Sequence, residues 1–403
     1  MKPNPIKSLA SQTAVYGLGT IVPRLLNYLL VPFYTRVFAQ TEYGQITELY
    51  AYVAFLLVFL TYGMETAFFR YAQKEGRKRV FNTAWSGIIL TTSVFVVLML
   101  IFYRPVAGAI GYSSESSYIL LIALIVSLDA ITAVPFALLR QQNKARVFAL
   151  IKIGNVSFNI ALNVLFLVLI PEKAAQWSSN LIGTDAGLVL WVFVSNLAAS
   201  LLTLLLLSPY IKGYRWKIDK ALYKPMLNYA LPVLVVGLAG MVNEVMDKLL
   251  LKHLLPESEN ALAQVGIYGA NYKLAVLMTL FIQMFRYAAE PFFFANAEKK
   301  ESPELFARVT NYFIIFGLAI FLLVTLYIDY FKLLIGNDFH EGLHIVPIIL
   351  LANLFYGIFF NLSIWYKLTD RTRYGALISL IGAAITLILN IILIPIWGYY
   401  GSA

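Results

Sequence analysis

Two positively charged residues, Arg24 and Lys273, lie deep inside long apolar segments of the chain. Arg24 comes about 11 residues, or roughly 16 Å along a helix, after the start of the first segment. A charge at that depth in a membrane costs at least about 2.5 kcal/mol, so each residue must face protein or water. A guanidinium can hold phosphate oxygens through two parallel hydrogen bonds. We therefore expect Arg24, with Lys273 as its counterpart, to bind an anionic phosphorylated ligand. The alternative for Lys273 is a glutamate partner or a side chain that extends to the membrane surface.

Three carboxylates inside apolar segments offer a different chemistry. Asp129 lies near the centre of the fourth segment, and Glu244 and Asp247 lie in the outer half of the seventh. A buried carboxylate can take up H+ or Na+ and couple movement of a solute to an ion gradient. The alternative is local neutralisation, in which Asp129 pairs with Arg24, and Glu244 pairs with Lys248 four residues later.

Several asparagines are predicted to line a polar cavity between helices. Three of them follow one another at intervals of four residues, so they share one face of a helix together with Lys152. Such a stripe either lines an aqueous cavity or mediates close helix packing, and both interpretations stay open. The predicted cavity-lining residues are Asn27, Asn155, Asn159, Asn163, Asn271 and Asn390.

The composition requires that these residues be held by membrane-spanning helices. The chain has 403 residues, is 60% hydrophobic and only 13% charged, and has a mean hydropathy of +0.75. A soluble protein carries about 25% charged residues. Apolar runs of about 20 residues, the length needed to cross a bilayer as a helix, recur along the whole chain. The sequence therefore predicts an all-α polytopic membrane protein.

About eleven apolar segments can be distinguished, six before a basic stretch and five after it. They lie at about 11–33, 44–69, 81–103, 117–139, 147–170, 187–208, 227–251, 264–294, 308–331, 343–366 and 374–395. We accordingly expect an N-terminal lobe over 1–211, a cytoplasmic linker over 212–226 and a C-terminal lobe over 227–403.

The two predicted lobes carry a repeat. Residues 144–165 (KARVFALIKIGNVSFNIALNVL) resemble residues 371–392 (RTRYGALISLIGAAITLILNII), and a shift of 227 maps Arg146 onto Arg373 and Asn163 onto Asn390. Six helices in the first half return the chain to its starting side, which predicts parallel repeats around a central cavity. The second half has only five segments, so we expect it to be truncated.

The distribution of basic residues predicts the orientation. With a cytoplasmic N-terminus, 21 of the 31 Lys and Arg residues fall on the inside and six on the outside. Anionic lipid headgroups account for these charges, so no nucleic-acid partner is expected. Glu65, Arg70 and Arg286 lie near cytoplasmic helix ends and could form a gate, although contact of the charged side chains with lipid headgroups is the better explanation.

No residue pattern indicates an enzyme or a bound cofactor. The chain has no cysteine and three histidines, and no His, Asp and Glu residues share a ligand spacing. The predicted connections between helices are short and leave no room for a catalytic domain. We therefore expect no metal, no cofactor and no catalytic residues.

Several short motifs resemble those of a known family. Pro32-Phe33-Tyr34-Thr35-Arg36 and Glu42-Tyr43-Gly44 resemble the P-x-x-T-R and E-Y-G signature of polysaccharide-exporting flippases. The second half is similar to the family's P…D-R…G-x-Y…P pattern. Its residues are Pro232, Asp247, Lys248 (where arginine is usual), Gly266, Tyr268 and Pro291, and Pro395, Gly398 and Gly401 resemble a later P-x-x-G-x-x-G run.

These motifs identify a resemblance to the oligosaccharide flippase branch of the multidrug/oligosaccharidyl-lipid/polysaccharide exporter superfamily. The resemblance implies two six-helix lobes that work by alternating access. It implies export of undecaprenyl-pyrophosphate-linked O-antigen, capsule or exopolysaccharide units across a bacterial inner membrane, with polysaccharide polymerase machinery as a further partner. Two alternatives stay open: a proton- or sodium-coupled multidrug exporter, and a membrane polymerase or glycosyltransferase.

Overall fold

The structure is a computed structural model that describes residues 17, 19–182, 187–256, 259–296, 302–369 and 371–403. Every regular element in these ranges is helical, as the sequence predicts. By their contacts, the residues divide into two compact units. The first unit comprises Met1–Asn27 and Leu49–Met241, and the second comprises Tyr28–Glu48 and Val242–Ala403. The lobe boundaries expected from the sequence stay a prediction.

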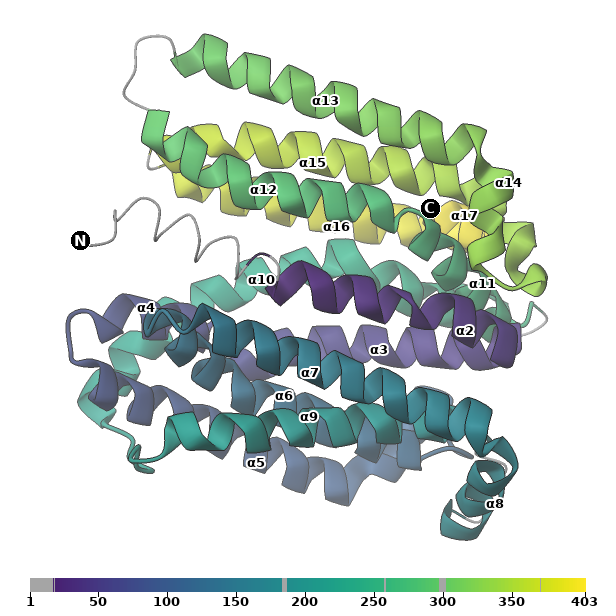
Figure 1. Ribbon diagram of the computed structural model, residues 1–403, viewed down its shortest axis with the longest axis horizontal. Helices are drawn as coiled ribbons and strands as arrows, with labels where there is room; N and C mark the ends of the chain where they lie inside the picture. The colour runs from purple at the N-terminus through teal and green to yellow at the C-terminus, as the bar shows by residue number, and fades with distance from the viewer. Residues whose placement is uncertain (1–16, 18, 183–186, 257–258, 297–301, 370) are drawn as a thin grey trace. The chain divides into compact units, whose positions relative to one another are not determined.

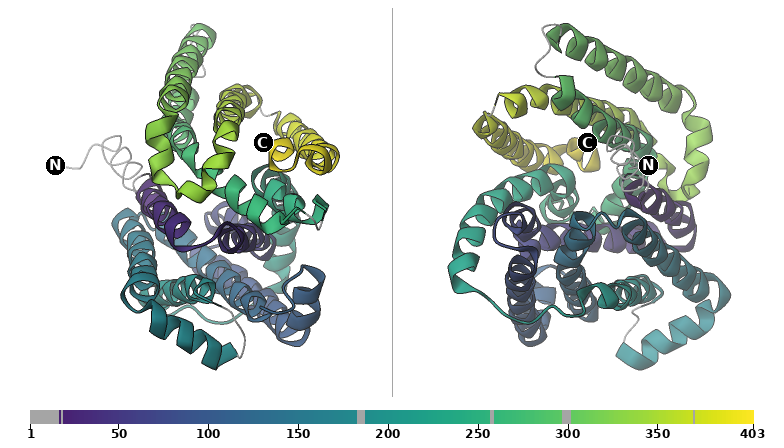
Figure 2. Two further views of the ribbon diagram at one scale, coloured as in Figure 1. Left: turned by 90° about the vertical axis from the view of Figure 1, so that its right-hand side faces the viewer. Right: turned by 60° about the vertical axis from the view of Figure 1, so that its left-hand side comes forward.

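The first unit is a bundle of long helices that pack side by side (Figure 1). α5 packs on α6, α6 and α7 both pack on α9, and α4 contacts α5 and α6. The left view of Figure 2 looks along several of these helices, whose axes are roughly aligned. Their bounds are α4 (Met64–Ala72), α5 (Arg77–Ala109), α6 (Ser117–Gln141), α7 (Ala145–Val164) with η1 (Leu165–Leu169), α8 (Pro171–Ile182) and α9 (Val189–Ile211).

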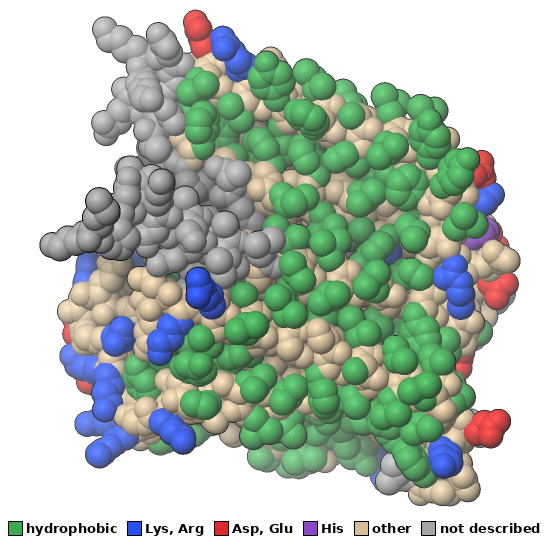
Figure 3. All heavy atoms as spheres, viewed as in Figure 1, with side chains coloured by type: hydrophobic (Ala, Val, Ile, Leu, Met, Phe, Trp, Pro, Cys, Tyr) green, Lys and Arg blue, Asp and Glu red, His purple; other side chains and the backbone are tan. Residues whose placement is uncertain are grey.

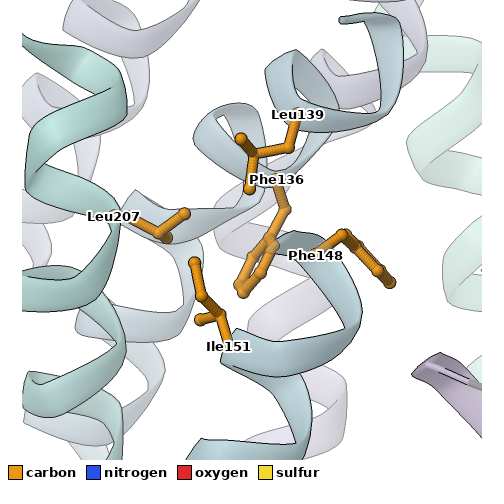
Figure 4. Packing of buried hydrophobic residues seen from close by; sticks show 5 residues of the cluster. All are labelled: Phe136, Leu139, Phe148, Ile151 and Leu207. Atoms are coloured by element: carbon orange, nitrogen blue, oxygen red, sulfur yellow. The ribbon is translucent and has the colours of Figure 1, made fainter. Parts of the chain in front are cut away.

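A small apolar core holds three of these helices together (Figure 4). Phe136 and Leu139 of α6 are three residues apart, as are Phe148 and Ile151 of α7, so each pair projects from one helix face. Leu207 of α9 completes the cluster. The rings of Phe136 and Phe148 meet edge to face with centroids 5.3 Å apart, a favourable geometry for aromatic pairs.

The second unit contains the later helices and an early segment of the chain. α12, α13 and α15 pack on one another, α15 contacts α16, and α11 contacts α2, α15 and η3. Its bounds are α2 (Leu30–Val37), α11 (Ala261–Leu274), α12 (Val276–Asn296), α13 (Ser302–Leu326), α14 (Ile328–Phe331), η2 (Lys332–Leu334), η3 (Asn337–Ile345), α15 (Val346–Leu368), α16 (Thr372–Trp397) and α17 (Tyr399–Ser402). α3 (Gln40–Thr61) and α10 (Lys220–Leu254) have residues in both units.

The described residues include nine helical stretches that are long and apolar enough to cross a membrane, or ten if a bent pair counts as one span. The bent pair is α11 and Val276–Arg286 of α12, at 50°, so the single helix expected at 264–294 is broken next to Ala275. The helix expected at 44–69 is interrupted at Tyr62 and Gly63, which have φ angles of 34° and 71°. The first expected helix begins outside the described residues.

The surface is apolar along the helices and charged at their ends (Figure 3). In the first unit, Lys and Arg side chains gather at the end where α4 and the connection between α9 and α10 lie. Exposed basic residues there include Arg70, Lys74, Arg77, Lys78, Arg79, Lys212, Arg215, Lys217, Lys220 and Lys224. The sequence assigns all of them to the cytoplasmic side, which stays a prediction.

Candidate functional site

The second unit contains a buried ion pair at the position where the sequence predicts ion coupling. Asp247 and Lys248 of α10 are each only 9% exposed. The Lys248 ammonium nitrogen lies 3.0 Å from both carboxylate oxygens of Asp247. The hydroxyl of Tyr268 on α11 donates to Asp247 Oδ2 at 2.7 Å. Lys248 therefore pairs with the side chain of Asp247, and from Glu244 it contacts only the backbone carbonyl oxygen.

Hydrogen bonds connect this pair to α16 and α17. Ser402 Oγ donates to Asn390 Oδ1 at 3.1 Å and lies 3.4 Å from the carbonyl oxygen of Asp247. Asn390 Nδ2 donates to the carbonyl oxygen of Thr386 at 2.8 Å, and Thr386 Oγ1 donates to Asn243 Oδ1 at 2.7 Å. Asn390 is buried in this network, so in the second unit it acts as a link between elements.

A second buried ion pair lies one helical turn further along α10. Lys252 Nζ lies 2.9 Å from Glu48 Oε2, and the Glu48 side chain is fully buried. The sequence analysis missed this pair. A usable signal was present, because Glu244, Lys248 and Lys252 follow one another at intervals of four and mark one charged face of α10.

Lys273 is the exposed cation of the same region. It lies in the last turn of α11, and the charged groups that act on it electrostatically are Lys248 and Glu244. Among the described residues, no carboxylate forms an ion pair with it. Asn271 beside it is fully buried and donates to the carbonyl oxygens of Ile267 and Phe339, so it ties α11 to η3.

Arg24 is exposed on a helical stretch, residues 19–28, that belongs to the first unit up to Asn27. Asn27, three residues later, is exposed as well, so the two residues share one helix face. In the described part of the chain Arg24 forms no ion pair. Asp129 accepts a hydrogen bond of 2.8 Å from Ser200 Oγ, and no ion pair between Asp129 and Arg24 is present among the described residues.

The polar stripe on α7 mediates packing at most of its positions. Asn159 and Asn163 are buried, and Asn163 Nδ2 donates to the carbonyl oxygen of Asn159 at 2.8 Å and to its side-chain oxygen at 3.1 Å. Asn155 Nδ2 donates to Thr203 Oγ1 of α9 at 2.9 Å. The Lys152 ammonium lies 4.2 Å from the centroid of the Phe136 ring. The contacts of Asn155 and Lys152 hold α7 against α9 and α6, whereas the hydrogen bonds of Asn163 lie within α7.

Two helices start at positions related by the predicted repeat. α7 begins at Ala145 and α16 at Thr372, which are related by the shift of 227 residues. In each helix the matching asparagine, Asn163 or Asn390, donates to the carbonyl oxygen four residues earlier at 2.8 Å. The same bond occurs at Asn271, Asn353 and Asn361, so these features are compatible with an internal repeat, which stays a prediction.

The residues proposed for a cytoplasmic gate have partners of their own. Glu65 forms an ion pair with Arg140 in the first unit. The guanidinium carbon of Arg70 lies 4.2 Å from the centroid of the Tyr229 ring. Arg286 belongs to the second unit, where its guanidinium carbon lies 4.3 Å from the centroid of the Phe360 ring. A gate formed by the three residues stays a prediction.

The signature motif in residues 32–44 has a structural role within the second unit. Thr35 Oγ1 accepts a hydrogen bond of 3.0 Å from the backbone nitrogen of Gly336, and Arg36 Nη2 donates to the carbonyl oxygen of Leu333 at 2.6 Å. The Tyr43 and Phe339 rings meet edge to face with centroids 5.4 Å apart. These contacts fix the start of α3 and the end of α2 to η2 and η3.

Gly44 allows α3 to approach α11 closely. A Cβ atom on Gly44 would lie 1.8 Å from the carbonyl oxygen of Leu262, and one on Gly266 would lie 2.1 Å from the carbonyl oxygen of Gln40. Such distances are far inside van der Waals contact, so only glycines permit this backbone-to-backbone approach. The E-Y-G and G-x-Y motifs therefore meet at one helix contact.

The described residues contain no group of three or more His, Asp or Glu side chains placed to hold a metal ion. Within the described residues, the polar features of the expected membrane spans include ion pairs, hydrogen-bonded amides and the exposed cations Arg24 and Lys273. Such groups can bind an anion or transmit a conformational change.

Comparisons with known proteins agree with this picture. Residues 9–297 match a family described as polysaccharide biosynthesis protein. The chain is 20% identical over 292 residues to the "Lsg locus putative protein 1" of Haemophilus influenzae, covering 72% of this chain and 67% of that protein. An uncharacterized membrane protein of the same organism is 18% identical over 299 residues, with the same coverage of both chains.

Two groups of solved structures share the fold. The lipid II flippase MurJ in an inward closed conformation superposes with a TM-score of 0.72 at 15% identity, covering 96% of this chain and 83% of that one. A multidrug resistance MATE family transporter in an outward-facing conformation gives 0.65 at 14% identity, covering 100% and 91%. These values establish the fold.

Proposed function

The chain belongs to the polysaccharide biosynthesis protein family, and from this premise we propose that it exports a lipid-linked oligosaccharide. The cargo would be an undecaprenyl-pyrophosphate-linked sugar unit, moved from the inner to the outer leaflet of the bacterial inner membrane by alternating access. The chain is a multi-pass membrane protein with a flippase-like fold. The identity of the glycan is left open, and the polymerase that extends the glycan would be its downstream partner.

This proposal rests on which basic residues of the apolar helices form ion pairs and which do not. In the second unit, Lys248 pairs with Asp247 and Lys252 pairs with Glu48, while Lys273 stays exposed and forms no ion pair with a described residue. Arg24 is exposed in the same manner in the first unit. An intramembrane cation without a fixed counter-ion is costly unless it meets an anion at some stage of its work. A pyrophosphate group supplies that anion, and it suits a guanidinium in particular.

The runner-up is a cation-coupled multidrug exporter, because the MATE transporters share the fold. A cationic drug would require carboxylates that are free to meet it. Asp247 and Glu48 are instead neutralised by lysines, which leaves Asp129, half-buried and hydrogen-bonded to Ser200, as a carboxylate that such a drug could meet. The pairing favours the anionic cargo. A polymerase or glycosyltransferase would need a catalytic constellation, and we propose none.

Transport in proteoliposomes tests the proposal. Purified protein would be reconstituted, and the appearance of a fluorescent undecaprenyl-pyrophosphate-linked sugar in the opposite leaflet would be followed by quenching. Loss of one charge-assisted contact costs about 1.5–3 kcal/mol, which corresponds to about 10- to 100-fold in rate. We expect Arg24→Ala and Lys273→Met to lose that much, and Arg24→Lys and Lys273→Arg to keep part of the activity.

Arg146→Ala is the matched control, since Arg146 is an exposed cation in the first turn of α7 and is predicted to lie at the membrane surface. It should flip the sugar at the wild-type rate. Wild-type rates for both Arg24→Ala and Lys273→Met, at equal amounts of reconstituted protein, would refute the proposed cation role. Efflux of a cationic dye with no sugar transport would favour the multidrug exporter.

A further inference from the structure

Lys248 has every hydrogen-bond donor of its ammonium group satisfied inside the protein. An ammonium has three N–H groups. The acceptors are Asp247 Oδ1 and Oδ2 at 3.0 Å each and the carbonyl oxygen of Glu244 at 3.2 Å. The ring centroids of Tyr272 and Tyr268 lie 4.2 and 5.5 Å from the same nitrogen, which adds cation–π attraction. The ammonium therefore resembles a bound cation with a complete set of ligands.

The carboxylate of Asp247 is satisfied as well. Oδ1 accepts from the backbone N–H of Lys248 at 2.8 Å, and Oδ2 accepts from the Tyr268 hydroxyl at 2.7 Å. Both oxygens also contact the Lys248 ammonium. These donors already stabilise the negative charge of the carboxylate, so binding of an external cation would add little favourable free energy.

The surrounding charges balance without any added ion. The carboxylates of this part of the second unit are Glu48, Glu244 and Asp247, and the ammonium groups are Lys248, Lys252 and Lys273. Lys252 is engaged with Glu48 at 2.9 Å, and Lys273 is repelled by Lys248 and attracted by Glu244. An additional cation at Asp247 would face the Lys248 ammonium, which lies 3.0 Å from both carboxylate oxygens, and repulsion is strong where the surroundings are buried.

We propose that Lys248 is the resident counter-ion of Asp247, so that this carboxylate binds no Na+ or other external cation. Asp247 was predicted as a residue that couples transport to an ion gradient, and with Lys248 in place it does not bind the coupling ion. This inference about the transport cycle rests on the proposed export function. Removal of the ammonium group should expose a site with a carboxylate, a tyrosine hydroxyl and a backbone carbonyl. Those are oxygen ligands of the kind that hard cations prefer. Lys248 thereby determines whether the site is closed or open to ions.

Thermal unfolding of the purified protein in detergent tests this inference with salts alone. Wild type, Asp247→Asn, Lys248→Met and the double variant would be compared in NaCl, LiCl and choline chloride at one ionic strength. We expect the difference in melting temperature between NaCl and choline chloride to be equal in wild type and Asp247→Asn. Lys248→Met should melt several degrees lower in choline chloride and recover in NaCl or LiCl, and the double variant should lose that recovery.

Two results would overturn the inference. One is stabilisation of the wild type by Na+ over choline that Asp247→Asn abolishes, because an external cation would then bind despite Lys248. The other is a folded Lys248→Met protein whose stability is the same in all three salts. If Lys248→Met does not fold, the comparison of wild type with Asp247→Asn still decides. No lipid-linked sugar is used, so the outcome is independent of the export assay.

Discussion

Lys252 and Glu48 form an ion pair in which the ammonium nitrogen lies 2.9 Å from a carboxylate oxygen, and the Glu48 side chain is completely buried. The pair joins α10 to α3, two helices far apart in the sequence, inside the second unit. A buried charge of either sign is tolerated only when the opposite charge is supplied. The pair therefore fixes which face of α10 packs against α3.

Breaking this pair should destabilise the protein strongly. Glu48→Gln leaves the Lys252 ammonium buried, and Lys252→Met leaves the Glu48 carboxylate buried, at a cost of about 3–5 kcal/mol each. The double variant should regain much of the loss, because it buries no uncompensated charge. Unfolding in detergent, followed by tryptophan fluorescence, measures the three variants. Losses that simply add in the double variant would show that the two side chains do not interact.

The fold class was predictable because it depends on composition alone. Apolar runs of the length of a bilayer force helices, and the structure contains them. The break at Ala275 was not predictable, since the local sequence Lys273-Leu274-Ala275-Val276 contains neither proline nor glycine. Bends without those residues arise from packing partners elsewhere in the chain, which a linear pattern does not reveal.

The sequence alone could select candidate residues for the site, but it could not show which partners these residues have in the folded chain. Depth within an apolar segment predicted Asp247 as a residue for ion coupling, and the structure places the ammonium of the adjacent Lys248 against its carboxylate. Asn271 was expected to line a cavity, and it is buried as a link to Phe339, 68 residues later. The partners of these residues come from distant parts of the sequence, so only the folded chain shows them.

The ion pair of Asp219 with Arg79 should make stability depend on pH. The hydrogen bond from Arg79 holds the pKa of the Asp219 carboxyl below its usual range, and the Arg79 Nη2 to Asp219 Oδ2 distance is 2.7 Å. A carboxyl with a lowered folded-state pKa contributes stability above its unfolded pKa of about 3.9. That contribution is lost as the pH falls through the folded-state pKa.

Asp219→Asn removes the titrating group and should flatten this part of the profile. We expect the difference in melting temperature between wild type and Asp219→Asn to shrink as the pH falls below about 4. Glu259→Gln, an acidic-to-amide change elsewhere in the chain, serves as a control. A difference between wild type and Asp219→Asn that stays constant down to pH 3 would contradict the assignment.

Arg36 should anchor the segment that contains η2 and η3. Its guanidinium donates to the carbonyl oxygens of Pro32 at 2.5 Å and Leu333 at 2.6 Å, which a lysine cannot reproduce with one nitrogen in the same geometry. Loss of such a charge-assisted hydrogen bond costs about 1.5 kcal/mol, or about tenfold in a local opening equilibrium. Hydrogen exchange should accelerate by that factor at residues 333–345 in Arg36→Ala and less in Arg36→Lys. Unchanged exchange in Arg36→Ala would show that Thr35 and Tyr43 hold the segment without it.

Gly44→Ala should prevent the close approach of α3 to α11. The added methyl group would lie 1.8 Å from the carbonyl oxygen of Leu262, and both are held by helix backbone, so the two helices must separate. Overpacking of this kind typically costs about 1–3 kcal/mol, and a backbone clash costs more. We expect a clear fall in melting temperature and in the yield of folded protein for Gly44→Ala and for Gly266→Ala. Gly154→Ala is the matched control, because no heavy atom lies within 4 Å of a Cβ placed there and alanine favours the helix by about 1 kcal/mol. If Gly44→Ala were as stable as Gly154→Ala, the two helices would not pack as closely as the structure shows.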